Sequence, residues 1–213
     1  ENNTVHGNSA TFGIWIKGAT YVLMANNTVS TAIIAVSVED DGTIMSSYII
    51  FRDNDIDNVW NGLVLLNVEE ALVMDNTFTN LDADYSEAAI GVYYGQNIAI
   101  SGNTMADGWN GIYLYYTTHL ELEGNVISVN NIGVYMEAVT YAHLANGTIS
   151  ADTGVLADEC YLCEIRGLDI SGGTIGVNVY EGCDSVLVAD CSLTGLFIGV
   201  KVYVALDTTV LNC

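Results

Sequence analysis

The sequence predicts an all-β solenoid, in which one chain winds through about nine coils of roughly 22 residues. Three observations lead to this prediction. A phrase of Gly or Ala followed by alternating apolar residues recurs along the chain, and a turn of the type Asn-Thr-apolar recurs with the same period. Between these phrases, short stretches rich in Val, Ile and Tyr have the alternation of strands, and almost no stretch has the period of a helix.

The glycine phrase sets the period. Successive phrases begin 22, 27, 29, 20, 22, 21, 22 and 23 residues apart. Each phrase predicts a strand in which the first and third residues after the glycine point inward, because side chains alternate between the two faces of a strand. The nine phrases begin at Gly13, Ala35, Gly62, Gly91, Gly111, Gly133, Gly154, Gly176 and Gly199.

The asparagine turn marks a second angular position of every coil. We expect its amides to lie in a bend, where each can bond to the backbone or to the amide of the next coil. The turns contain Asn3, Asn27, Asn54, Asn76, Asn103 and Asn125, and alignment continues the column through Gly147, Leu168, Cys191 and Cys213.

A coil of this length has room for three short strands and three bends. It resembles the right-handed parallel β-helix of the pectin-lyase-like superfamily, whose coils carry the same Asn-x-Ile and Gly-Ile-x-Leu phrases. The resemblance covers nearly the whole chain and implies a single β-helix domain over residues 1–213. It implies no particular activity, because that superfamily contains lyases, hydrolases, epimerases, phage tailspikes and surface proteins.

Charge limits the classes of partner. The chain has 26 Asp and Glu against 4 Lys and Arg, which gives a formal net charge of -22. This balance disfavours nucleic acid and anionic membranes, and leaves cations, neutral glycans and similar proteins. No apolar run approaches the ~18 residues of a spanning helix, so no membrane insertion is expected. The acidic composition with five Cys favours an extracellular or cell-surface location.

Four of the cysteines fall in pairs on adjacent coils. Alignment of the last coils places Cys160 beside Cys183 and Cys191 beside Cys213. The strand spacing lies near the range of ~4.4–6.8 Å between Cα atoms that a disulfide tolerates, so we predict these two bonds, with stacked free thiols as the alternative. Cys163 falls in an inward column and is interpreted as a buried thiol.

The outward positions of the glycine strands carry an aromatic surface. Such a surface is common where a protein meets a sugar ring or another protein. Three interpretations remain open: a glycan platform, an assembly interface, and a tyrosine-rich strand face without a partner. The residues of this predicted surface are Trp15, Tyr93, Tyr113, Tyr115, Tyr135, Tyr180 and Tyr203.

Catalytic chemistry has a weak signal. A lyase acting on a uronate needs Arg or Lys against developing negative charge, and the four cations here are scattered by the alignment. The motifs of polygalacturonases are absent. Glu137 and Asp158 are outward neighbours on adjacent coils, near the ~5 Å separation of a retaining glycosidase pair. The preferred prediction is a protein without catalysis, and this pair is the alternative active site.

Two acidic turns offer oxygen ligands for calcium, although neither follows a defined loop signature and solvated turns are the alternative. No other cofactor or metal is expected, because the three histidines form no cluster. The candidate calcium ligands are Glu39, Asp40 and Asp41 in the first turn and Asp82, Asp84 and Glu87 in the second.

The leading functional hypothesis is an extracellular structural solenoid that assembles with its own kind into a sheath, filament or surface layer, stabilised by disulfides. The asparagine column starts at Asn3 and stops at Cys213, and no capping helix is predicted, so coils of successive chains could stack. A piece cut from a longer protein explains the same register. The alternative function is a carbohydrate-binding or carbohydrate-active β-helix that uses the tyrosines with Glu137 and Asp158.

Overall fold

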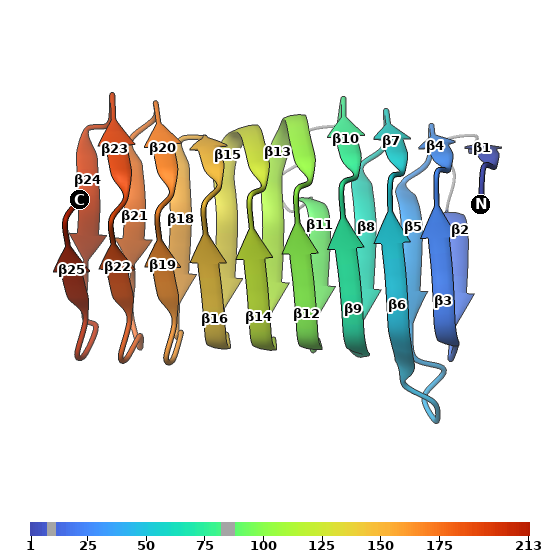
Figure 1. Cartoon of the computed structure of the whole chain (residues 1–213), viewed down its shortest axis with the longest axis horizontal. Helices are drawn as coiled ribbons and strands as arrows, with labels where there is room; N and C mark the ends of the chain where they lie inside the picture. Colours follow the sequence, from blue (N-terminus) through green and yellow to red (C-terminus); the bar gives the residue numbers. More distant parts are fainter. Residues whose placement is uncertain (8–11, 82–87) are drawn as a thin grey trace.

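The computed structural model describes residues 1–7, 12–81 and 88–213. These residues form a right-handed parallel β-helix of about nine coils, as the sequence predicts (Figure 1). Every strand pair among them is parallel, and the described part of the chain consists of strands, turns and bends. No helix capable of crossing a membrane occurs among these residues.

Each coil passes through three rows of strands. The first row contains short strands: β1 (Thr4–His6), β4 (Thr28–Ser30), β7 (Asp55–Asp57), β10 (Thr77–Thr79), β17 (Thr148–Ser150), β20 (Asp169–Ser171) and β23 (Ser192–Thr194). The second row contains the glycine phrases: β2 (Phe12–Lys17), β5 (Ile34–Glu39), β8 (Asn61–Leu66), β11 (Ala88–Tyr93), β18 (Thr153–Asp158), β21 (Ile175–Val179) and β24 (Ile198–Val202). Two longer strands, β13 (Thr104–Tyr115) and β15 (Val126–Glu137), run through both rows, which joins them into one 16-stranded sheet.

The third row forms a separate sheet of nine strands. In Figure 1 this sheet lies in front of the glycine row, so the solenoid has two main layers. Its strands are β3 (Thr20–Ala25), β6 (Ser46–Arg52), β9 (Val68–Met74), β12 (Gln96–Ser101), β14 (Thr118–Glu123), β16 (Thr140–Ala145), β19 (Glu164–Arg166), β22 (Leu187–Ala189) and β25 (Thr209–Leu211).

The core lies between the sheets and consists of stacked aliphatic side chains. β-branched and aliphatic residues suit a pleated surface that is buried, which explains their repetition at the inward positions of each coil. In the glycine row, one inward column runs through Val36, Leu63, Ile90, Ile112, Val134, Val155 and Val177, all of them buried.

The asparagine ladder has the structure that the sequence predicts. Asn54 donates from its backbone N and from Nδ2 to Oδ1 of Asn76, at 2.9 and 3.0 Å. Asn76 repeats both bonds to Oδ1 of Asn103, at 3.0 and 2.9 Å. Five successive amides, from Asn27 to Asn125, are buried, so this bend is a continuous polar column inside the solenoid.

One coil has a different register from the one predicted. The phrase at Gly91 was aligned with the other glycines, but Ile90 pairs with Leu63 and Ile112, so Ala89 takes the glycine position. Val92 therefore lies in the second inward column. The unequal steps of 29 and 20 residues around Gly91 result from this shift of two residues, because an alanine is also small enough for the site.

Candidate functional site

The outer face of the glycine row carries a cluster of six tyrosines on three successive coils, which we call the tyrosine stripe. It lies at the C-terminal ends of β11, β13 and β15 and in the turns that follow β11 and β13. Parallel pairing fixes its geometry, since Tyr93 pairs with Tyr115 and Tyr113 pairs with Tyr135. The stripe consists of Tyr93, Tyr94, Tyr113, Tyr115, Tyr116 and Tyr135.

The tyrosine rings are packed against one another. Ring centroids are 5.1 Å apart for Tyr113 and Tyr135, 5.5 Å for Tyr93 and Tyr113, and 4.6 Å for Tyr115 and Tyr116. Aromatic pairs at these separations are attractive beyond their buried area. The rings therefore support each other as one surface with limited freedom.

Gly91 explains the position of Tyr93. Gly91 pairs with Val64 on the preceding coil and with Tyr113 on the following coil, so both neighbours carry a side chain on the outer face and Gly91 carries none. A Cβ on Gly91 would come within 3.0 Å of Cε2 of Tyr93. The ring of Tyr93 thus covers the glycine and fills the space that a side chain would occupy.

Two of the six tyrosines were not predicted as members of the site. Tyr94 and Tyr116 follow the strand ends in left-handed backbone conformations, with φ of 57° and 49°. These turns carry their rings into the stripe, where Tyr94 is 48% exposed and Tyr116 is 51% exposed. The available signal was the doubled tyrosine at two strand ends, Tyr93-Tyr94 and Tyr115-Tyr116.

Glu137 and Asp158 border the stripe: Glu137 lies on the third coil of the stripe and Asp158 on the coil after it. They are paired residues of β15 and β18, as the sequence predicts. Tyr113 donates from its hydroxyl to Oε2 of Glu137 at 2.8 Å. The negative charge of Glu137 also acts on the neighbouring hydroxyl of Tyr135. Glu137 is therefore held by the hydroxyl of Tyr113.

Asp158 differs from Glu137 in its electrostatics. Burial raises the pKa of Asp158, and the neighbouring carboxylates of Glu159, Glu137 and Glu181 raise it further. Asp158 therefore keeps its proton to a higher pH than an ordinary aspartate. The two carboxyl groups therefore differ in their surroundings: Glu137 accepts a hydrogen bond from Tyr113, whereas Asp158 lies among other carboxylates.

The hydroxyls of Tyr113 and Tyr135 resist ionisation. Burial raises the pKa of Tyr135 to about 12, with a contribution from the negative charge of Glu137. Burial and the hydrogen bond to Glu137 also raise the pKa of Tyr113. The neutral hydroxyls can thus donate hydrogen bonds throughout the neutral and moderately alkaline range.

An alkaline titration checks these environments. Because the folded pKa values exceed the unfolded value of ~10, the stability that they contribute is fully present below pH ~10 and is lost as the pH rises through the folded values. We expect tyrosinate absorbance to include a late component near pH 12 that loses one equivalent in Tyr135→Phe, with circular dichroism reporting the folded state. A titration complete near pH 10 in the folded protein would contradict this assignment.

The remaining aromatic residues of the predicted surface lie apart from the stripe. Trp15 is on β2 at the first coils, where its ring stacks on Phe12 at 5.2 Å. Tyr180 and Tyr203 stack on each other at 5.3 Å at the last coils, with Lys201 Nζ 5.9 Å from each ring. The predicted surface is therefore three separate aromatic groups, and the stripe is the largest.

The first candidate calcium turn has its carboxylates engaged elsewhere. Asp41 accepts from the backbone N of Thr43 and Ile44 at 2.8 and 2.6 Å. Glu39 contacts the Trp15 indole N–H and lies 3.9 Å from Lys17 Nζ. Among the described residues, no group of three or more His, Cys, Asp or Glu side chains is placed to hold a metal ion, so calcium at this turn stays a prediction. The second candidate turn, with Asp82, Asp84 and Glu87, lies outside the described residues.

The cysteines stack as the alignment predicts, but all five are free thiols. The backbone N of Cys160 donates to Sγ of Cys183 at 3.3 Å. The pKa of Cys160 is raised because its thiol hydrogen-bonds to Cys163 and Cys183 and is buried. Burial raises the pKa of Cys191, whose thiol contacts Cys213 on the next coil. Neither predicted disulfide is present in the structure, although both pairs are neighbours.

Comparisons with known proteins agree with this fold. The model of a family described as periplasmic copper-binding protein (NosD) matches residues 33–195, more than half of the chain. The family's description supports a location outside the cytoplasm in the broad sense. A comparison of the sequence with curated proteins finds no significant match.

Solved structures show the same architecture. ORF18 of Geobacillus virus E2 gives a TM-score of 0.60 at 14% identity, over 98% of this chain and 54% of its own. A double mutant of the periplasmic alginate epimerase AlgG gives a TM-score of 0.56 at 14% identity, over 94% of this chain and 47% of its own. The chain thus spans about half the length of these proteins, and the likeness concerns the fold alone.

The family's description names copper, for which Cys, Met and His are the usual ligands. Within residues 1–7, 12–81 and 88–213, no group of three or more His, Cys, Asp or Glu side chains is placed to hold a metal ion. His119 stacks on Tyr141 at 5.1 Å, and His143 faces Glu164 at 4.0 Å. The described His, Cys, Asp and Glu side chains thus offer no group of three that would hold copper.

Proposed function

The chain belongs to the family described as periplasmic copper-binding proteins (NosD), and we propose that it acts outside the cytoplasm as a carbohydrate-binding β-helix. The observation that carries this proposal is the tyrosine stripe: six packed rings on three coils beside Glu137 and Asp158. Aromatic rings receive the apolar faces of sugars, and hydroxyls and carboxylates bond to sugar hydroxyls.

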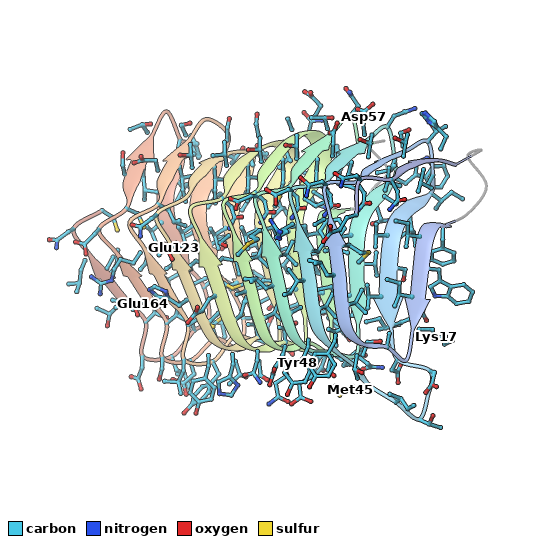
Figure 2. The ribbon with its side chains drawn as sticks, turned by 45° about the vertical axis from the view of Figure 1, so that its right-hand side comes forward. Lys17, Met45, Tyr48, Asp57, Glu123 and Glu164 are labelled. Carbon is cyan, nitrogen blue, oxygen red and sulfur yellow. The ribbon has the colours of Figure 1, made fainter. Side chains whose placement is uncertain are left out.

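The charge of the surface selects the sugar. Each of the four cations is occupied away from the stripe: Lys17 with Glu39, Arg52 with Asp53, Arg166 with Glu164 and Asp190, and Lys201 over Tyr180 and Tyr203. Lys17 and Glu164 lie toward opposite ends of the solenoid in Figure 2. A uronate polymer such as alginate would meet Glu137 and Asp158 without a compensating cation, so the ligand is a neutral or amino sugar.

Hydrolysis of the bound sugar is a second candidate function. The pairing of Glu137 with Asp158 across β15 and β18 supports it, because a retaining glycosidase uses two neighbouring carboxyl groups. Asp158, whose pKa is raised by burial, would be the acid, and Glu137, which accepts a hydrogen bond from Tyr113, would be the nucleophile. Loss of turnover in Asp158→Asn and Glu137→Gln, with binding retained, would assign this activity, whereas binding without turnover in the wild-type protein leaves a binding module.

Binding measurements on tyrosine variants test the proposal. An array of neutral, amino and uronate oligosaccharides identifies the sugar class, and calorimetry measures the affinity of the best ligand. We expect Tyr116→Ala to weaken binding about tenfold or more, which corresponds to ~1.4 kcal/mol. Tyr203→Ala is the matched control, because Tyr203 is 49% exposed, close to the 51% of Tyr116, but lies at the last coil. Binding to no sugar, or equal affinities in both variants, would contradict the proposal.

Self-assembly and the two disulfides are separate proposals that rest on the register of the sequence. The stacking of Cys160 on Cys183 and the contact of Cys191 with Cys213 support the disulfides, because each pair needs only the loss of two hydrogens to an oxidant to form a bond. Intact-mass measurement under non-reducing conditions tests the bonds. Electron microscopy with and without reductant tests assembly, and dispersed single molecules in both conditions would rule it out.

A further inference from the structure

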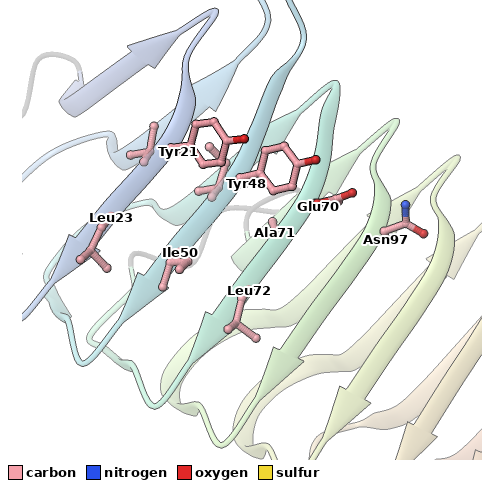
Figure 3. A pocket seen from close by; sticks show the side chains of 10 residues that line it. Tyr21, Leu23, Tyr48, Ile50, Glu70, Ala71, Leu72 and Asn97 are labelled. Carbon is pink, nitrogen blue, oxygen red and sulfur yellow. The ribbon is translucent and has the colours of Figure 1, made fainter.

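A hollow lies on the nine-stranded sheet, away from the tyrosine stripe. It is a groove of about 450 Å³ across β3, β6, β9 and the start of β12. Figure 3 shows two rows of outward side chains running across these strands, with the tyrosine rings in one row and aliphatic side chains in the other. The rows are Tyr21, Tyr48, Glu70 and Asn97, and Leu23, Ile50 and Leu72.

The aliphatic row is unusual for an outer strand face. Leu23 is 44% exposed and Ile50 is 37% exposed, although an outward position of a solvated sheet is normally polar. The same row continues beyond the groove through the polar residues Glu121, His143 and Glu164, which β14, β16 and β19 carry at matching positions. The continuous apolar stretch therefore lies on the first coils, with Leu187 a single apolar residue farther along the row, and it forms a patch of the kind that marks an interaction surface.

The tyrosine row makes one wall of this patch. The rings of Tyr21 and Tyr48 are stacked, with centroids 4.8 Å apart and planes 6° from parallel. Glu70 continues the row on the next coil, and Asn97 follows it. The wall is thus aromatic on its first two coils and acidic on the third.

Charge separates the classes of occupant. Glu70 lines the groove on β9 and Glu69 precedes it in the strand, and none of the ten residues that line the groove is basic. A second copy of this chain would bring the same acidic edge and a net charge of -22. An anionic membrane is disfavoured for the same reason. A sugar would find few polar groups between the aliphatic and aromatic rows, whereas the tyrosine stripe offers hydroxyls and carboxylates.

We propose that this groove docks a segment of a partner protein that carries apolar side chains together with at least one Lys or Arg. The apolar side chains lie between the two rows, and the basic group pairs with Glu69 or Glu70. Four coils at ~4.8 Å spacing give a groove of roughly 15 Å, the length of four to five extended residues. The proposal does not depend on sugar binding at the stripe.

Synthetic peptides test the proposal on the full chain. The probes are fluorescent peptides of alternating Leu and Lys, of Leu and Glu, and of Ser and Lys, measured by anisotropy. We expect the Leu–Lys peptide to bind and the other two to bind at least tenfold more weakly, because the groove selects apolar and basic groups together. Equal binding of the Ser–Lys peptide would mean non-specific attraction to an acidic protein and would overturn the proposal, as would no binding of the Leu–Lys peptide.

Variants locate the binding. Ile50→Ser is expected to weaken binding of the Leu–Lys peptide at least tenfold, and Glu70→Gln to weaken it and to reduce its dependence on salt. Leu187→Ser is the matched control, since Leu187 occupies the same row on β22 outside the groove. Unchanged binding in Ile50→Ser overturns the proposal. The proposal is also overturned if the wild-type protein sediments as a dimer that becomes a monomer in Ile50→Ser. It is overturned as well if a sugar on the array binds only when Ile50 is present.

Discussion

Replacing Asn76 with Ala is expected to lower the free energy of unfolding by about 3–5 kcal/mol, because it breaks the buried ladder at its centre. Oδ1 of Asn76 accepts two hydrogen bonds from Asn54, and its Nδ2 donates to the carbonyl of Phe51 at 3.0 Å and to Asn103 at 2.9 Å. The side chain is 1% exposed, so water cannot replace these partners without entering the core. Each polar group left unsatisfied in such a site costs ~1–3 kcal/mol.

Asn3→Ala is the matched control in the same ladder. Asn3 donates to Oδ1 of Asn27 at 3.1 Å from both its backbone N and its Nδ2, but it is exposed on the first coil. Water can take the place of the lost amide there, so we expect a loss below ~1 kcal/mol. Urea denaturation of both variants measures the difference. Similar losses in the two variants would mean that the ladder contributes through its turn conformation and not through its buried amides.

Phe78→Ala is expected to cost about 3–5 kcal/mol through a cavity in the core. Phe78 is fully buried on β10. Its ring centroid is 6.5 Å from that of Phe51 on β6. The ring also fills the space over Gly62, where a Cβ would come within 2.5 Å of Cδ1 of Phe78. The backbone of a parallel solenoid is fixed by ladders on both sides, so the walls of the cavity have little room to collapse.

The control for this substitution is Phe197→Ala. Phe197 is 86% exposed and lies outside the strands, so the same change of side chain should alter the free energy of unfolding by less than ~0.5 kcal/mol. Thermal and urea unfolding of the two variants give the comparison. If Phe78→Ala were as mild as Phe197→Ala, the core around β10 would have to relax far more than the stacked coils suggest.

The fold could be predicted because a solenoid repeats its requirements. Every coil needs inward aliphatic residues in the glycine row and a small residue where the first row of strands approaches it, and with Ala89 in place of Gly91 these appear every 21 to 27 residues. The asparagine ladder was predictable for the same reason, since one amide per coil satisfies its neighbour. Repetition makes a weak local signal strong when nine copies are aligned.

The candidate site was only partly predictable because it departs from the repeat. Gly91 resembles the column glycines, yet Ala89 holds that position, and only the pairing of Ile90 with Ile112 shows the shift. Tyr94 and Tyr116 join the stripe through left-handed turns, which the alternation of strands does not describe. Alternation gives the face on which a strand residue lies, but it gives no direction for a side chain in a turn.

The bonding partners of individual side chains also could not be predicted from the alignment of the coils. Register placed Cys160 beside Cys183, but adjacency does not determine whether the thiols are bonded. The turn at Asp41 contains enough carboxylates for a cation, yet local hydrogen bonds to Thr43 and Ile44 occupy that side chain. The groove at Ile50 was missed because outward apolar residues of one sheet looked like ordinary strand composition, and only the structure places them beside Tyr48 and Glu70.

A crystal structure of the chain with the best-bound oligosaccharide from the array would show whether the tyrosine stripe binds sugar. We expect a sugar ring on the exposed faces of Tyr94 and Tyr116, with sugar hydroxyls bonded to Glu137 or Asp158. A sugar seated elsewhere, such as at Ile50 in the groove of the nine-stranded sheet or on the Tyr180–Tyr203 pair, with the stripe empty, would contradict it.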